Sequence, residues 1–179
     1  MKWTLDTTHS AAEFAVKHLM ISTVKGHFKT FTGSGETNSD GTLKSAELTI
    51  DASSINTNVE SRDNHLKSPD FFDVAQFPTI TFKSTKIEQT GTDISITGDL
   101  TMHGMTKPVT LKGELTSAVK DPWGNQRTAL AVSSKINRKD WGLHWNQALE
   151  AGGFAVGEDV KLSIEFEAVA VKDEALVAA

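Results

Sequence analysis

One stretch near the C-terminal end of the chain decides the fold, and it reads Val160-Lys161-Leu162-Ser163-Ile164-Glu165-Phe166-Glu167-Ala168. Apolar and polar side chains alternate strictly along it, which is typical of a β-strand with one buried face and one face in water. The same alternation recurs in weaker form through most of the chain. The sequence therefore predicts an all-β protein.

About eight segments carry this pattern of alternation. The clearer ones cover residues 46–52, 79–83, 94–102, 109–115 and 158–171, and less regular ones cover residues 12–19, 24–31 and 128–136. Short runs rich in Gly, Asn, Asp and Ser separate them and predict turns between sequential strands. Because an open sheet would expose both its edges and its apolar face, we predict a closed, eight-stranded antiparallel barrel.

One interval after the third strand, residues 54–74, breaks the alternation. Thr57 and Glu60 have the spacing of a capping box, which predicts a helix from about residue 58 to 67. Ser68-Pro69 indicates a second helical turn behind it, because proline is favoured at the first helical position. We therefore expect a short helical insertion after the third strand.

Size and composition limit the classes of function. The chain has 179 residues, which fits a single domain over residues 1–172, with a small acidic tail at 173–179 that we expect to fray. The net charge is −5 with no basic block, which argues against a nucleic-acid partner. The absence of cysteine excludes disulfides, cysteine-ligated zinc, iron–sulfur clusters and thiol catalysis.

The N-terminal segment and the hydropathy pattern bear on location. Residues 1–9 contain no apolar h-region and include Asp6, so we expect no secretory signal and a cytoplasmic location. Apolar runs reach about five residues, far below the roughly 20 that span a bilayer, so no transmembrane segment is predicted.

The alternation assigns one set of side chains to the inside of the barrel. We expect the following thirteen to line a ligand-binding tunnel: Phe14, Val16, His18, Phe28, Leu48, Ile50, Phe82, Ile96, Leu100, Met102, Leu162, Ile164 and Phe166. Nearly all of them lack directional hydrogen-bonding groups, so such a wall would select for apolar bulk and length. An ordinary filled core is the alternative interpretation of the same pattern.

Two further features concern the space inside the barrel. Gly26, Gly98 and Gly113 are expected to face inward, where they either leave room for a ligand or relieve bends in coiled strands. The last strand could run from Glu158 to Val171, roughly 45 Å at ~3.3 Å per residue. A tall and narrow apolar tunnel suits a long-chain molecule.

We find no residue pattern that requires catalysis or a metal. His9, His18 and His27 recur every nine residues, but the strand register sends His18 inward and His27 outward, so no metal site is predicted. Arg62-Asp63 is expected to be a solvated pair on the helix surface. A rival hypothesis is an enzyme acting on a lipid head group, with His18 or His103 as general base.

A series of short motifs gives the chain a specific resemblance. In order they are Trp3, Asp6, His9-Ser10, Gly26-x-Phe28, Ser54-Ile55-x-Thr57, Arg62-Asp63-x-x-Leu66, Asp70-Phe71-Phe72-Asp73, Phe77-Pro78, Gly98-x-Leu100-Thr101-x-His103-Gly104, Asn137-Arg138-x-Asp140-x-Gly142 and Val156-Gly157. From residue 3 to about 171 the chain resembles the YceI-like family of polyisoprenoid-binding proteins. The resemblance implies a lipocalin-like barrel that carries a long isoprenoid or fatty-acyl-type lipid, with no established catalytic residue and no cofactor.

We therefore predict non-catalytic binding or carriage of a long-chain isoprenoid lipid, either a prenyl lipid or an isoprenoid quinone, by a monomer or homodimer. The alternatives are an enzyme that modifies a lipid head group and a filled barrel that serves as a structural or interaction module. Residues 62–72, 103–106 and 137–142 are expected to form either the mouth of the tunnel or structural corners.

Overall fold

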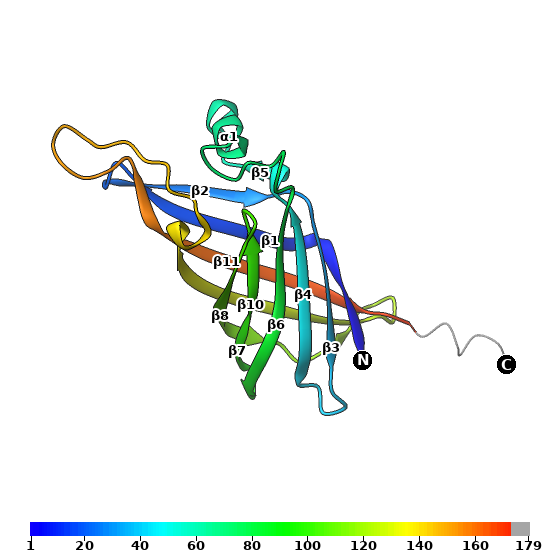
Figure 1. Cartoon of the computed structure of the whole chain (residues 1–179). Coiled ribbons are helices and arrows are strands. Elements are labelled where there is room, and N and C mark those ends of the chain that lie inside the picture. The colour runs from blue at the N-terminus through cyan, green and yellow to red at the C-terminus, as the bar shows by residue number, and fades with distance from the viewer. Residues whose placement is uncertain (173–179) are drawn as a thin grey trace.

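The computed structural model describes residues 1–172 of the chain (Figure 1), so the predicted fraying of residues 173–179 lies outside the described residues. The elements are β1 (Lys2–His18), β2 (Ser22–Phe28), β3 (Phe31–Thr37), β4 (Leu43–Asp51), η1 (Ala52–Ser54), β5 (Ile55–Asn56), α1 (Glu60–Lys67), β6 (Thr79–Thr90), β7 (Asp93–Met102), β8 (Met105–Leu115), β9 (Val119–Lys120), β10 (Gln126–Asn137), η2 (Arg138–Trp141) and β11 (Val156–Ala170). Within the described part, neither α1 nor the two 3-10 turns is long and apolar enough to cross a membrane.

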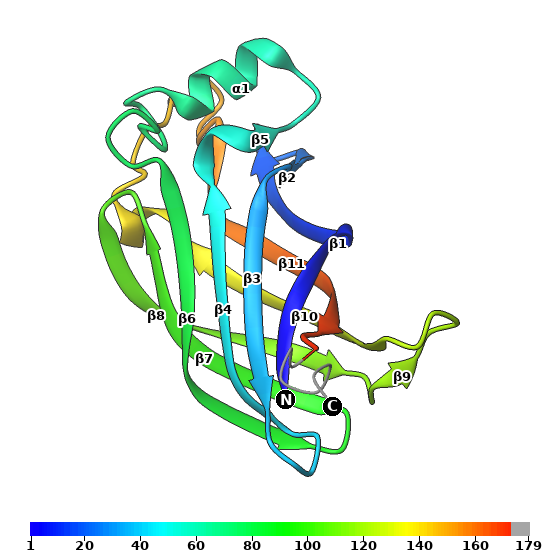
Figure 2. The same ribbon diagram turned by 90° about the vertical axis from the view of Figure 1, so that its right-hand side faces the viewer.

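Eight of these strands close into a barrel. The order is β11-β10-β8-β7-β6-β4-β3-β1, and β1 pairs with β11 to complete the ring. All of these pairings are antiparallel. Strand β2 is not one of these eight strands and pairs with β1. Figure 2 shows it near the end of the barrel that α1 covers. The predicted eight-stranded antiparallel barrel is confirmed.

Strand β1 departs from a simple succession of neighbours. Its first residues pair with β3, whereas its second half, from Ala12 onward, pairs with β2. Between the two halves, residues 7–10 stand opposite a single residue of β11, because Asp6 pairs with Glu167 and Ala11 with Glu165. Such a bulge bends a strand, and β1 changes direction sharply in Figures 1 and 2. The same edge of β1 therefore pairs first with β3 and then with β2.

The sequence prediction missed β3 and gave its place in the ring to β2. The segment predicted as one strand over residues 24–31 ends at Phe28, and β3 begins at Phe31 after a two-residue connection. Gly33 and Gly35 occupy alternate positions of β3 that face the interior. Because glycine contributes no apolar side chain, the alternation that marks the other strands is absent from β3.

The helical insertion is present, but its start differs from the prediction. Strand β5 and α1 lie across one end of the barrel (Figure 2). Val59 is the N-cap residue and makes no side-chain capping bond, so the predicted capping box is wrong. The Thr57 hydroxyl donates instead to Asp63 Oδ1 at 2.6 Å. After Ser68 the chain forms turns rather than the predicted second helical turn.

Candidate functional site

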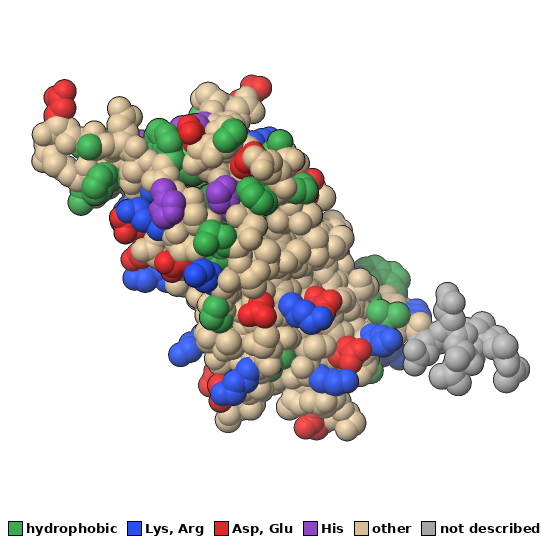
Figure 3. All heavy atoms as spheres, viewed as in Figure 1, with side chains coloured by type: hydrophobic (Ala, Val, Ile, Leu, Met, Phe, Trp, Pro, Cys, Tyr) green, Lys and Arg blue, Asp and Glu red, His purple; other side chains and the backbone are tan. Residues whose placement is uncertain are grey.

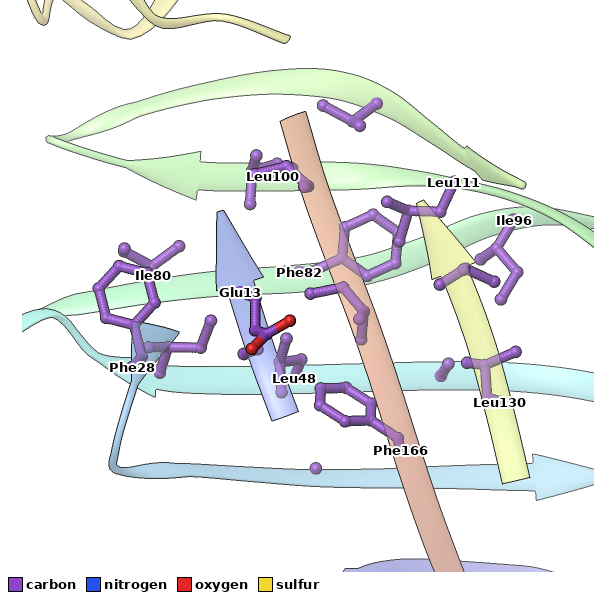
Figure 4. Close-up of a pocket in the computed structure, with 18 of the residues that line it drawn as sticks. Glu13, Phe28, Leu48, Ile80, Phe82, Ile96, Leu100, Leu111, Leu130 and Phe166 are labelled. Atoms are coloured by element: carbon purple, nitrogen blue, oxygen red, sulfur yellow. The ribbon is translucent and has the colours of Figure 1, made fainter. Parts of the chain in front are cut away.

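The barrel contains an apolar cavity with a volume of about 240 Å³ (Figure 4). Every strand of the ring contributes to its wall, together with β2, α1 and the turn after α1. One water needs roughly 10–15 Å³ on the same measure. The space is therefore too large for a packing defect and has the character of a binding cavity.

Twelve of the thirteen side chains assigned to the interior border this cavity: Phe14, Val16, Phe28, Leu48, Ile50, Phe82, Ile96, Leu100, Met102, Leu162, Ile164 and Phe166. Figure 4 shows several of them converging from different strands. The period of two along each strand is what places them together, because alternate residues share one face. Their contact with a ligand stays a prediction.

His18 is the exception and does not border the cavity. Val16 pairs with Val160, but His18 pairs with Val156, so β11 carries two more residues than β1 between these pairs. The extra residues lie on β11, whereas the ladder between β1 and β2 continues unbroken from Val16↔Val24 to His18↔Ser22, so His18 keeps the side of the sheet on which Val16 lies. The cavity wall on β1 ends at Val16, and the role predicted for His18 in ligand binding stays a prediction.

The inward glycines do not leave room for a ligand. A Cβ atom at Gly98 would lie 2.5 Å from the Lys83 carbonyl oxygen and would collide with the Phe82 ring. At Gly113 it would strike the backbone of β10, and at Gly26 it would strike the Phe14 ring. At these three positions the absence of a Cβ atom lets a neighbouring ring or strand backbone pack directly against the glycine. The glycines that do border the cavity are on β3 instead.

The prediction omitted several residues of the cavity wall. Leu66 on α1 and the following Phe71 and Phe72 close one end, and the Phe72 ring packs edge-on against Phe28 at a centroid distance of 6.1 Å. They belong to an insertion, so strand alternation could not find them. The same alternation could have found Ile80, Val109, Leu111, Leu115, Leu130, Val132, Ile136 and Val160.

Buried hydrogen bonds hold α1 over the cavity. The Asp63 carboxylate is buried and accepts from the Thr57 amide at 2.8 Å as well as from its hydroxyl. Arg62 donates through Nε to the Thr57 hydroxyl at 2.7 Å and through Nη2 to the Thr57 carbonyl at 2.9 Å. The expected solvated ion pair of Arg62 and Asp63 is therefore wrong, because both side chains anchor the start of the helix.

Aromatic contacts join α1 to the loop between η2 and β11. The His65 ring packs edge-on against Phe71 and Trp145, at centroid distances of 5.1 and 4.7 Å. The Phe71 and Trp145 rings lie 5.2 Å apart. This cluster fixes two segments far apart in sequence over the same end of the barrel.

The segments 103–106 and 137–142 pack together as a structural corner. His103 Nδ1 forms a hydrogen bond with the Trp141 carbonyl at 3.0 Å. The buried Trp141 ring donates through Nε1 to the Leu100 carbonyl, also at 3.0 Å. Both segments therefore stabilise the barrel wall beside the cavity.

Arg138 in η2 is a buried cation at the cavity wall, with 4% of its surface exposed. It donates to the backbone carbonyls of Gly157, Leu143 and Val156. Burial lowers the pKa of its guanidinium from the usual value, and the charge of Glu158 opposes that shift. Arg138 thus ties η2 to the start of β11.

A second polar cluster lies where β1 meets β11. Arg127 donates to Asp6 Oδ2 and Asp121 Oδ2, each at 2.8 Å, and also to Glu167. Hydrogen bonds from Arg127 hold the pKa values of the Asp6 and Asp121 carboxyls well below their usual range. The side-chain atoms of Asp6, His9 and Glu167 that could bind a metal ion lie within 4.8 Å of one another. Arg127 already pairs with Asp6 and Glu167, so the positive charge beside these two carboxylates comes from its guanidinium.

A closed antiparallel barrel of eight strands around an apolar cavity defines a lipocalin-like class of protein. A YceI-like domain model matches residues 3–168, and the chain belongs to this family. The UPF0312 protein SA2479 of Staphylococcus aureus strain N315 is 46% identical over 168 residues, covering 92% of this chain and 95% of that one. The UPF0312 protein SAB2563 of the bovine strain RF122 is 45% identical with the same coverage.

Solved structures share the fold. The Campylobacter jejuni YCEI protein is 31% identical with a TM-score of 0.74, covering 87% of this chain and 90% of that one. BcnA of Burkholderia cenocepacia is 20% identical with a TM-score of 0.76, covering 91% and 98%. A polyisoprenoid binding domain from Saccharophagus degradans is 17% identical with a TM-score of 0.67, covering 94% and 98%.

Proposed function

We propose that the protein binds a long-chain isoprenoid lipid, either a prenyl lipid or an isoprenoid quinone, and carries it without chemical change. The observation that carries this proposal is the cavity, whose wall is built almost entirely from aliphatic and aromatic side chains. Burial of apolar area contributes about 25 cal/mol per Å² before ordering costs. The ligand named for the Saccharophagus degradans domain supports the same chemical class.

The polar groups near the cavity favour carriage over catalysis. Among residues 1–172, the charged residues at the cavity wall are Glu13, Glu47 and Arg138. Glu47 pairs with Lys83 at 3.0 Å, and Arg138 is committed to backbone carbonyls. His103, a general base in the rival hypothesis, does not border the cavity and is bonded to Trp141.

The cavity also argues against a barrel filled by its own side chains, which was the other alternative. A homodimer and a cytoplasmic location stay predictions from the sequence. Sedimentation of the purified protein and fractionation of cells would test them.

Cavity occupancy can be tested directly. We expect organic extraction and native mass spectrometry of the purified protein to reveal a bound lipid, or uptake of added farnesyl and longer prenyl chains. Leu48→Trp places a larger side chain into the cavity and should weaken binding of the longest chain by at least about tenfold. Thr49→Trp, on the exposed face of the same strand, is the matched control and should bind normally.

Two results would contradict the proposal. One is a protein that carries no lipid and takes up no prenyl chain. The other is equal affinity in Leu48→Trp and wild type, with both folded by circular dichroism, because the cavity would then be irrelevant to binding.

A further inference from the structure

Four exposed apolar side chains form a projecting tip. Leu19, Met20, Ile21 and Phe154 are exposed by 39%, 66%, 83% and 52%, and together they are called the apolar tip. The Leu19 amide donates to the Ala155 carbonyl at 2.8 Å, which joins the β1–β2 hairpin to the loop before β11. Figure 1 shows both segments projecting beyond the barrel, and Figure 3 shows apolar side chains gathered there.

The turn at the apolar tip holds two large apolar residues in a backbone conformation that is unfavourable for them. Leu19 and Met20 have positive φ angles of 51° and 64°, and the Ile21 amide closes the turn on the His18 carbonyl at 3.2 Å. A turn with two positive φ angles favours Asn and Gly, because large L side chains are strained there. Two strained residues that also expose apolar surface indicate a functional demand on this turn.

Lysine side chains flank the apolar tip. Lys17, Lys25 and Lys161 are exposed on the outer face at its base, where Ala15 pairs with both Lys25 and Lys161. None of the ion pairs found in residues 1–172 includes these three lysines, although Glu150 lies in the adjacent loop.

This combination fits a membrane surface. Aliphatic and aromatic side chains enter the boundary of the acyl chains, while flanking lysines contact anionic head groups. The tip side chains offer no strong hydrogen-bonding group, unlike the polar rim of a typical protein interface. We propose that the apolar tip docks on the surface of an anionic lipid bilayer.

The cavity begins directly behind the tip. His18 at the base of the tip pairs with Val156, and Val156 and the nearby Val16 both border the cavity. Docking would bring this end of the cavity next to the acyl layer and shorten the path of a lipid between membrane and barrel. This part of the inference rests on the proposed function.

Vesicle flotation tests the docking. Wild type should float with phosphatidylcholine vesicles that contain phosphatidylglycerol, and less with phosphatidylcholine alone. Met20→Asn together with Ile21→Asp should lower vesicle affinity at least about tenfold without loss of stability, because Asn suits a positive φ angle. Val119→Asp is the matched control, since Val119 is 63% exposed on β9 outside the tip, and should float normally.

Three outcomes would overturn the docking: no flotation of wild type, equal flotation of the tip variant, or a wild-type dimer that the tip variant converts to a monomer. The last outcome would make the tip a contact between two copies of the chain. Native mass spectrometry separates the two proposals. A lipid-loaded protein that never floats overturns the docking alone, whereas a protein that floats but takes up no prenyl chain overturns the proposed function.

Discussion

Gly98 lies on the inner face of β7 with no room for a side chain. Gly98→Ala would press a Cβ atom against the Phe82 ring and the Lys83 carbonyl. Overpacking of this kind costs about 1–3 kcal/mol, and urea unfolding would measure the loss. Ser95→Ala, on the other face of β7, should change stability by less than about 0.5 kcal/mol. Equal stability of Gly98→Ala and wild type would show that the strands separate easily at this point.

The positions of single residues could be predicted only where the alternation is unbroken. Phe82 and Ile164 fall inside the barrel as expected, because neighbouring residues on a strand face opposite sides. His18 shares a face with Val16 but lies beyond the end of the cavity wall, and the alternation alone does not show where the cavity ends. The function of Gly98 depends on a ring from β6, so no local pattern around residue 98 could reveal it.

Helix α1 depends on tertiary hydrogen bonds more than on its own sequence. Asp63→Ala would leave the buried amide and hydroxyl of Thr57 without their acceptor, at a cost of about 1–3 kcal/mol. We expect faster hydrogen exchange over residues 57–67, with unchanged exchange in β11. The matched control is Asn64→Ala, because Asn64 is exposed on the same helix. Uniformly faster exchange in all strands would contradict a local role.

Elements with strong periodicity were predicted well, and elements defined by tertiary contacts were not. The long strand β11 and the place of the helical insertion follow from the sequence. Strand β3 does not, because Gly33 and Gly35 remove its apolar signal. The capping box predicted at Thr57 is also absent, because the Thr57 hydroxyl donates to Asp63 instead. That hydrogen bond depends on how β5 and α1 pack together, which the local sequence does not show.

Closure of the whole barrel involves the charge cluster around Arg127. This side chain extends from β10 to Asp6 on β1 and Glu167 on β11, beside the bulge of β1, and also holds Asp121 in the preceding turn. Without it, three carboxylates would face one another at the junction of the first and last strands. We therefore expect Arg127→Gln to unfold at a lower temperature near neutral pH.

The cluster also sets the response of the barrel to acid. Arg127 lowers the pKa values of Asp6 and Asp121 in the folded state, while an unfolded aspartate titrates at about 3.9. The stabilisation is therefore complete above about pH 4 to 5 and is lost as the pH falls further, because protons then bind the unfolded chain preferentially. The thermal unfolding temperature of the wild type should therefore fall steeply below about pH 4. The unfolding temperature of Arg127→Gln should fall less over the same interval, because its carboxyls have lost the partner that lowered their pKa values. Parallel plots of unfolding temperature against pH for the two proteins would contradict this origin of acid sensitivity.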